Sequence, residues 1–177
     1  MSYRMALLIL GSLALAACGG DDGDDGNTAT TTTSTTDEEE NPDVHTCEHL
    51  GEASVQVAAS ADAATAPVEE LGHVTYEVTL QNMQGVYSGF MGLTVPADAG
   101  GEYVVFLTTA TDLKVVDSTS TTLTVTDDCT EKPCSDVCAT ILSRYEVNLP
   151  AGDYTLAIGP TADAKVRVLF SATAHAQ

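Results

Sequence analysis

The sequence predicts an all-β fold: an antiparallel β-sandwich of about eight strands that follows a disordered tether. Three observations favour this class. Apolar residues recur with a period of two from Val44 onward, turn-forming residues interrupt that pattern at regular intervals, and helical periodicity is weak. A chain of 177 residues has room for one such domain and a tail.

The expected strands alternate apolar and polar side chains, as a sheet with one buried face requires. The run 103–107 is apolar on both faces and predicts a central strand. Residues 52–70 are expected to form a strand and then a loop, and 133–142 has room for one helical turn. The other strands are expected at 74–80, 91–95, 113–115, 123–125, 145–149, 154–158 and 166–170.

Residues 1–17 are predicted to be a signal peptide. A basic start, Tyr3-Arg4, precedes an apolar stretch that ends at Leu15 and is shorter than the roughly 20 residues that a membrane span needs. The stretch closes with the run Leu15-Ala16-Ala17-Cys18. This run resembles the lipobox of bacterial lipoproteins. The resemblance implies cleavage before Cys18, a diacylglycerol on the Cys18 sulfur, and an acylated amino terminus.

The residue after the cysteine carries a second expectation. Lipoproteins with aspartate at that place tend to stay in the inner membrane, whereas this chain has Gly19. By that resemblance we expect an outer-membrane lipoprotein, on its periplasmic or its outer face.

Residues 18–43 are predicted to be a disordered linker, and 44–177 the sandwich domain. Residues 19–43 contain nine acidic residues, no Lys or Arg, and a threonine-rich run that offers nothing to pack. The whole chain has a formal net charge of −20. Such a surface repels phosphate backbones and anionic lipid headgroups. We therefore expect no nucleic-acid partner, and membrane attachment through acyl chains instead of charge.

Four cysteines remain after Cys18, an even number that favours two disulfides in an exported chain. Four cysteines allow three pairings. We favour Cys129–Cys134, a clip around Pro133, and Cys47–Cys138, a long-range tie. The alternative is free thiols that bind metal, although the spacing of the last three cysteines is not that of a zinc knuckle or ribbon.

Three stretches carry a second resemblance: 95–107, 112–118 and 149–156, the last with the sequence Leu149-Pro150-Ala151-Gly152-Asp153-Tyr154-Thr155-Leu156. Their turn-and-strand patterns are similar to those of the bacterial pre-peptidase C-terminal domain. The resemblance implies a jelly-roll-like sandwich that accompanies or binds a partner and is not a catalyst. The chain has no Gly-x-Ser-x-Gly nucleophile motif, and its cysteines are expected to be oxidised, so we predict no enzymatic activity.

The histidines form the sharpest local pattern. In an extended segment, His45, Cys47 and His49 would share one face at about 6–7 Å spacing. With His73 and His175, the remaining histidines, four imidazoles could converge on Zn²⁺ or copper without Cys47. The alternative is that these are solvated polar residues and that Cys47 is half of a disulfide.

Acidic residues around Cys129 offer a weaker site. Asp127, Asp128, Glu131 and Asp136 could supply oxygen ligands to Ca²⁺, but they lack the ordered spacing of an EF-hand. A solvated, charged loop explains them as well. The sequence therefore leaves two functions open. The first is a membrane-anchored, non-catalytic binding or accessory module that needs no cofactor and has an unidentified envelope protein or ligand as its partner. The second is a lipoprotein that binds Zn²⁺ or copper.

Overall fold

The computed structural model describes residues 42–129 and 131–173. These residues belong to one compact unit with its own hydrophobic core. The predicted signal peptide, Cys18, nearly all of the predicted linker and His175 lie outside the described residues. No helix in the described part of the chain is both long and apolar enough to cross a bilayer.

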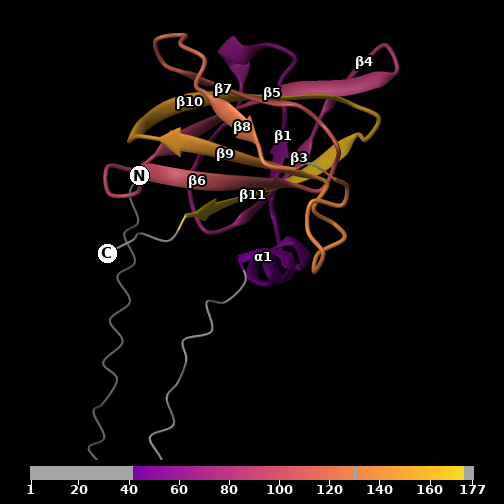
Figure 1. Ribbon diagram of the computed structural model, residues 1–177. Coiled ribbons are helices and arrows are strands. Elements are labelled where there is room, and N and C mark those ends of the chain that lie inside the picture. The colour runs from indigo at the N-terminus through magenta and orange to yellow at the C-terminus, as the bar shows by residue number, and fades with distance from the viewer. Residues whose placement is uncertain (1–41, 130, 174–177) are drawn as a thin grey trace, which may run out of the picture. The chain divides into compact units, whose positions relative to one another are not determined.

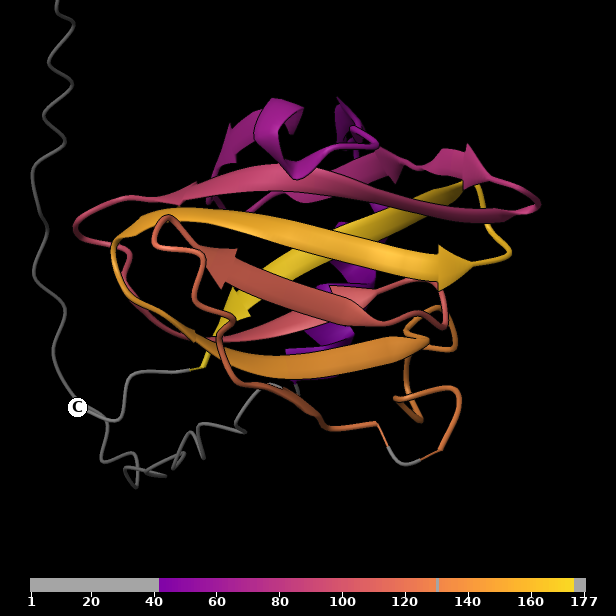
Figure 2. The ribbon, with the colours of Figure 1, turned by 90° about the horizontal axis from the view of Figure 1, so that it is seen from above.

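Two packed β-sheets make up the domain, so the predicted all-β sandwich is confirmed (Figure 1). One sheet has six strands in the order β1-β3-β11-β6-β9-β8, and the other has the order β2-β5-β10-β7 with β4 paired to β5 (Figure 2). Their bounds are β1 Val55–Ala58, β2 Val68–Glu70, β3 Thr75–Thr79, β4 Gln81–Met83, β5 Val86–Val95, β6 Gly101–Leu107, β7 Leu113–Asp117, β8 Val125–Asp127, β9 Ser143–Leu149, β10 Gly152–Thr161 and β11 Lys165–Ala172.

Most strand pairs are antiparallel, as predicted, but both sheets are mixed. β1 runs parallel to β3, with Val55 opposite Tyr76, and β2 runs parallel to β5. One strand of each parallel pair comes from residues 52–70, which we expected to form one strand and a loop. That segment instead contains β1, a short 3-10 helix at Ala63–Thr65, and β2.

The main core lies between the sheets and follows the predicted alternation. In β9, Tyr145, Val147 and Leu149 are buried while the residues between them are exposed. In β10, Leu156 is fully buried against the opposite sheet. The predicted turn between these strands is also present: Gly152 has a φ of 151°, in the region that favours glycine.

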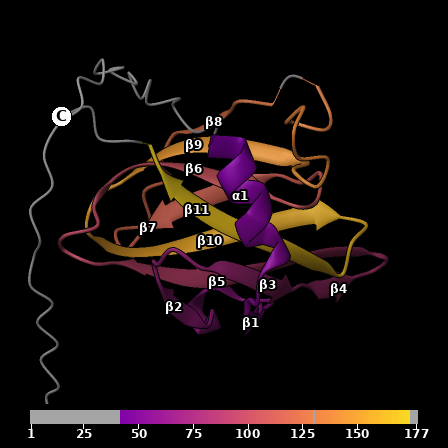
Figure 3. The same ribbon diagram turned by 90° about the horizontal axis from the view of Figure 1, so that it is seen from below.

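A second, smaller core lies on the outer face of the six-stranded sheet. β6 is apolar on both faces, as predicted, because its alternate residues Val104 and Phe106 belong to this outer core. A helix lies across that face of the sheet (Figure 3). The helix, α1 (Pro42–Gly51), contributes Leu50 to this outer core. Its other buried members are Cys138, Ile141 and Leu169.

Helix α1 corrects the prediction of an extended segment at 45–49. Pro42 stands in the first turn of the helix, where its missing N–H costs nothing, and Asp43 adds a favourable charge there. The helix also begins two residues before the expected domain boundary at residue 44. The described residues of 133–142, by contrast, contain no helical turn.

The cysteines lie in the pairs that the sequence favoured. The sulfur atoms of Cys47 and Cys138 are 2.10 Å apart, and those of Cys129 and Cys134 are 1.98 Å apart. The first pair joins α1 to the loop after β8 across 91 residues, and the second closes that loop on itself.

Candidate metal centre

Helix α1 places two of the predicted histidines on one face. His45 and His49 are four residues apart, so their side chains lie one turn above the other. Their Nε2 atoms are 3.2 Å apart, and both rings are half-buried. The two histidines therefore share one face, as we predicted, but in a helix and not in an extended segment.

His73 joins them from the segment before β3. Its Nε2 atom is 2.9 Å from that of His49, and its ring centroid is 5.3 Å from that of His45. The parallel pairing of β1 and β3 explains this meeting. Since α1 leads into β1 and His73 leads into β3, both arrive at the same end of neighbouring strands.

The segment that carries His73 is fixed by a buried tyrosine. The Tyr76 hydroxyl donates to the Glu70 carbonyl oxygen at 2.5 Å and accepts from the Gly72 N–H at 3.2 Å. Tyr76 is 1% exposed, and its burial raises the pKa of the hydroxyl, which therefore remains a donor. These bonds hold the backbone immediately before His73 against the core.

The three Nε2 atoms are spaced as ligands of one small cation would be. The candidate ligand atoms of His45, His49 and His73 all lie within 4.8 Å of one another. Two imidazole nitrogens bound tetrahedrally to zinc at 2.0–2.1 Å would be about 3.3–3.4 Å apart. The two closest contacts, 3.2 and 2.9 Å, are near that separation.

Glu52 orients the central ring of the cluster. Its Oε2 atom lies 2.9 Å from Nδ1 of His49, so this nitrogen carries the proton and donates it. In the neutral form of the ring, the lone pair is then on Nε2, the atom that contacts His45 and His73. A carboxylate behind a ligating histidine is the usual outer partner at a metal site, since it fixes the tautomer and strengthens the ligand.

The electrostatics favour the neutral form of His73. Burial, then the neighbouring His49 and His45, lowers the pKa of His73 below its ordinary value, and Glu52 opposes this shift. A histidine with a lowered pKa is neutral at pH 7, and neutral imidazole is the form that binds metal.

The carbonyl end of α1 is tied to the sheet beside the cluster. Thr75 donates its hydroxyl to the His49 carbonyl oxygen at 2.8 Å, and the Arg167 guanidinium donates to that of Leu50. The Cys47–Cys138 pair and the packing of Leu50 add two further contacts. The positions of His45 and His49 therefore depend on the His49 carbonyl oxygen and on contacts made by Cys47 and Leu50 of the same helix.

Three of the four predicted ligands thus come together, and the fourth, His175, lies outside the described residues. Cys47 does not join them, because it pairs with Cys138 on another side of the helix. Glu52 was missed, although its position three residues after His49 is a signal for contact on a helix.

The acidic loop does not form a second cluster of this kind. Of the predicted carboxylates, Asp128 is already paired with Arg144 at 3.1 Å, and the same guanidinium lies 3.5 Å from Asp43 of α1. Within the described residues, the imidazole cluster is the one group of side chains with metal-ligand spacing.

Comparison with known proteins does not assign a function to this cluster. No protein-family model matches the chain, and no curated protein matches it significantly.

Proposed function

We propose that this protein is a lipid-anchored envelope protein whose β-sandwich binds a divalent transition-metal ion through His45, His49 and His73. The observation that carries the proposal is the convergence of three imidazole Nε2 atoms from two separate segments. In this proposal the sandwich is a non-catalytic scaffold that holds the two segments together.

The ligand set favours particular metals. Three neutral nitrogen donors suit Zn²⁺, Cu²⁺ and Ni²⁺, whereas Mg²⁺ and Ca²⁺ prefer oxygen donors. The surrounding negative charge also favours any cation: the chain carries a formal −20, and Glu52 is directly behind the cluster.

The anchor in this proposal is Cys18. The order of basic start, short apolar stretch, small residues and cysteine supports lipidation at that residue, and Gly19 supports sorting to the outer membrane. The acidic, threonine-rich linker would span roughly 25–30 Å as a flexible coil. The domain would then hold its metal close to the membrane but clear of the lipid surface.

Calorimetric titration of Zn²⁺ and Cu²⁺ into residues 19–177 tests the metal proposal. We expect one site per chain. His49→Ala and His73→Ala should each weaken binding at least about 100-fold, because each removes a ligand. Glu52→Gln should weaken it about tenfold, since the carboxylate acts only through His49.

The matched control is Glu48→Gln. Glu48 is exposed on the same helix, and its substitution changes the charge as Glu52→Gln does without touching the imidazoles. Equal losses in the two glutamate variants would mean that general negative charge, and not the cluster, attracts the ion. His175→Ala weakens binding only if the C-terminal histidine supplies a further ligand.

Mass spectrometry of the protein from its native membrane tests the anchor. We expect an amino terminus at Cys18 that carries a diacylglycerol and an additional acyl chain, and a Cys18→Ser variant that leaves the membrane fraction. An unmodified or different amino terminus would contradict this part of the proposal and leave the metal site unaffected.

A further inference from the structure

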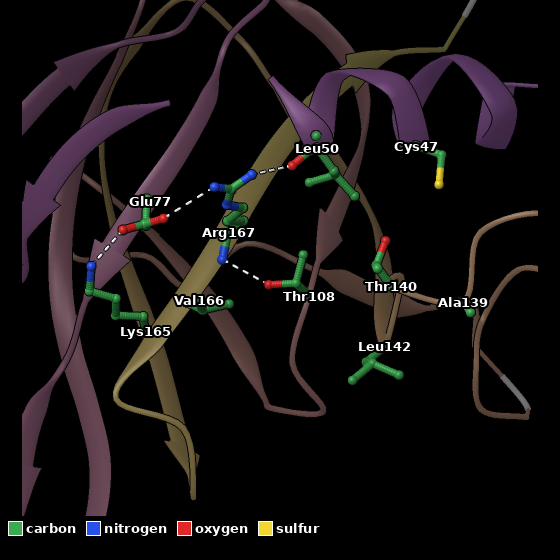
Figure 4. A pocket seen from close by; sticks show the side chains of 11 residues that line it. Cys47, Leu50, Glu77, Thr108, Ala139, Thr140, Leu142, Lys165, Val166 and Arg167 are labelled. Atoms are coloured by element: carbon green, nitrogen blue, oxygen red, sulfur yellow. Dashed lines mark hydrogen bonds and ion pairs between the residues drawn. The ribbon is translucent and has the colours of Figure 1, made fainter. Parts of the chain in front are cut away.

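A cavity that is separate from the imidazole cluster opens beside the carbonyl end of α1. It has a volume of about 630 Å³ and lies between the helix, the β3–β11 pair and the segment 139–142 (Figure 4). That volume is within the roughly 300–1,000 Å³ typical of pockets for small ligands.

One side of the cavity is apolar. Leu50 and Cys47 line it from the helix, and Ala139 and Leu142 line it from the facing segment. Figure 4 shows Cys47, Ala139 and Leu142 on the side away from Glu77 and Lys165, with Leu50 between them and next to Arg167. A hydrocarbon chain placed here would be removed from water at about 25 cal/mol per Å² of buried apolar surface.

The opposite side is a cationic rim. Lys165 Nζ lies 2.6 Å from one oxygen of Glu77, and the Arg167 guanidinium lies 3.4 Å from the other. Two positive charges therefore share one carboxylate. The Lys165 side chain is 57% exposed and uses one of its three donors in the contact with Glu77, so it can contact a second anion.

This rim contrasts with the rest of the chain. The sequence has six Lys and Arg residues against 26 Asp and Glu, and two of those six line this cavity. An anion would be repelled by most of the surface and attracted here. The apolar side and the cationic rim together match a molecule with a hydrocarbon body and one negative end.

We propose that this cavity binds a small amphipathic carboxylate, with its hydrocarbon chain against Leu50 and Leu142 and its carboxylate at Lys165. The charge complementarity of the rim selects this class over neutral or cationic amphiphiles. The site is independent of the metal proposal, since none of the three histidines lines the cavity.

Titration of dodecanoate into metal-free residues 19–177, followed by NMR and calorimetry, tests the inference. This chain keeps the entire described domain and omits only the leader and Cys18. We expect the methyl signals of Leu50, Ala139 and Leu142 to shift on binding. Lys165→Gln should weaken affinity about five- to tenfold, as the loss of one partly exposed charge contact predicts.

Two controls sharpen the result. Lys114→Gln removes the charge of an exposed lysine in β7 that does not line the cavity. This variant should bind dodecanoate as tightly as the parent protein does. Ala139→Phe fills the cavity from an exposed position and should abolish binding. Three outcomes would overturn the inference: cavity signals that do not move at about 1 mM ligand, a Lys165→Gln variant that binds like the parent, or dodecyltrimethylammonium binding as tightly as dodecanoate.

Discussion

Replacing Cys47 and Cys138 together by alanine should lower the free energy of unfolding by about 2–4 kcal/mol and weaken zinc binding about tenfold. The stability loss follows from the 91-residue separation of the pair, because a tie across so long a loop restricts the unfolded chain strongly. The affinity loss has a different cause. The pair holds the helix that carries His45 and His49, and His73 is held by another segment.

The contacts that remain set the size of the affinity loss. Without the cysteine pair, α1 keeps the bond from Thr75 to the His49 carbonyl oxygen, the bond from Arg167 and the packing of Leu50. These contacts should keep the helix on the sheet but allow it more movement, which widens the spacing of the imidazoles. Chemical denaturation without metal gives the stability, and calorimetry gives the affinity.

The other cysteine pair provides the matched control. Cys129 and Cys134 are five residues apart, so this pair restricts the unfolded chain less, and its removal should cost about 2 kcal/mol, the low end of the range for the long-range pair. Cys134 packs against the outer core, but the pair makes no covalent link to α1, so zinc affinity should stay near the parent value. If the two double variants bound zinc equally well, the helix would be positioned by its non-covalent contacts alone.

The sandwich was predictable because its strands obey simple rules. The buried and exposed residues of β9 alternate, which gives the period of two that the sequence shows. Strand β6 is apolar on both faces because it has the main core on one side and Phe106 beneath α1 on the other. The parallel pairs were not predictable, since nothing local in a short strand specifies the direction of its neighbour.

Helix α1 was missed because its histidines fit two periods equally well. His45 and His49 share a face both in a strand, where alternate residues align, and in a helix, where residues four apart align. Only Cys47, midway between them, distinguishes the two. The helix signals in this segment are the proline and the acid at its start, Pro42 and Asp43.

The cluster itself was predicted in part, and its geometry was not. His73 meets His49 only because β1 and β3 are parallel neighbours, a tertiary fact. The cationic rim of the cavity likewise depends on tertiary structure and could not be predicted from the sequence. Glu77 and Arg167 are 90 residues apart and face each other through the register of β3 and β11.

Substituting Phe106 by alanine should lower the free energy of unfolding by about 3–5 kcal/mol, which is the cost of removing a fully buried aromatic side chain and leaving a cavity. Phe106 lies in the outer core with Leu50, and the Arg144 guanidinium is stacked over its ring at 5.6 Å. Because this core is the surface on which α1 rests, zinc affinity should fall as well.

Leu156→Ala separates the two effects. Leu156 is equally buried, but it lies in β10 and in the main core, away from α1. It should cost a comparable 2–5 kcal/mol and, wherever the protein remains folded, leave zinc affinity unchanged. The milder Phe106→Leu should weaken zinc binding at a smaller cost in stability. If zinc affinity fell in proportion to stability in all three variants, it would report only the folded fraction, and the outer core would have no specific part in placing His45 and His49.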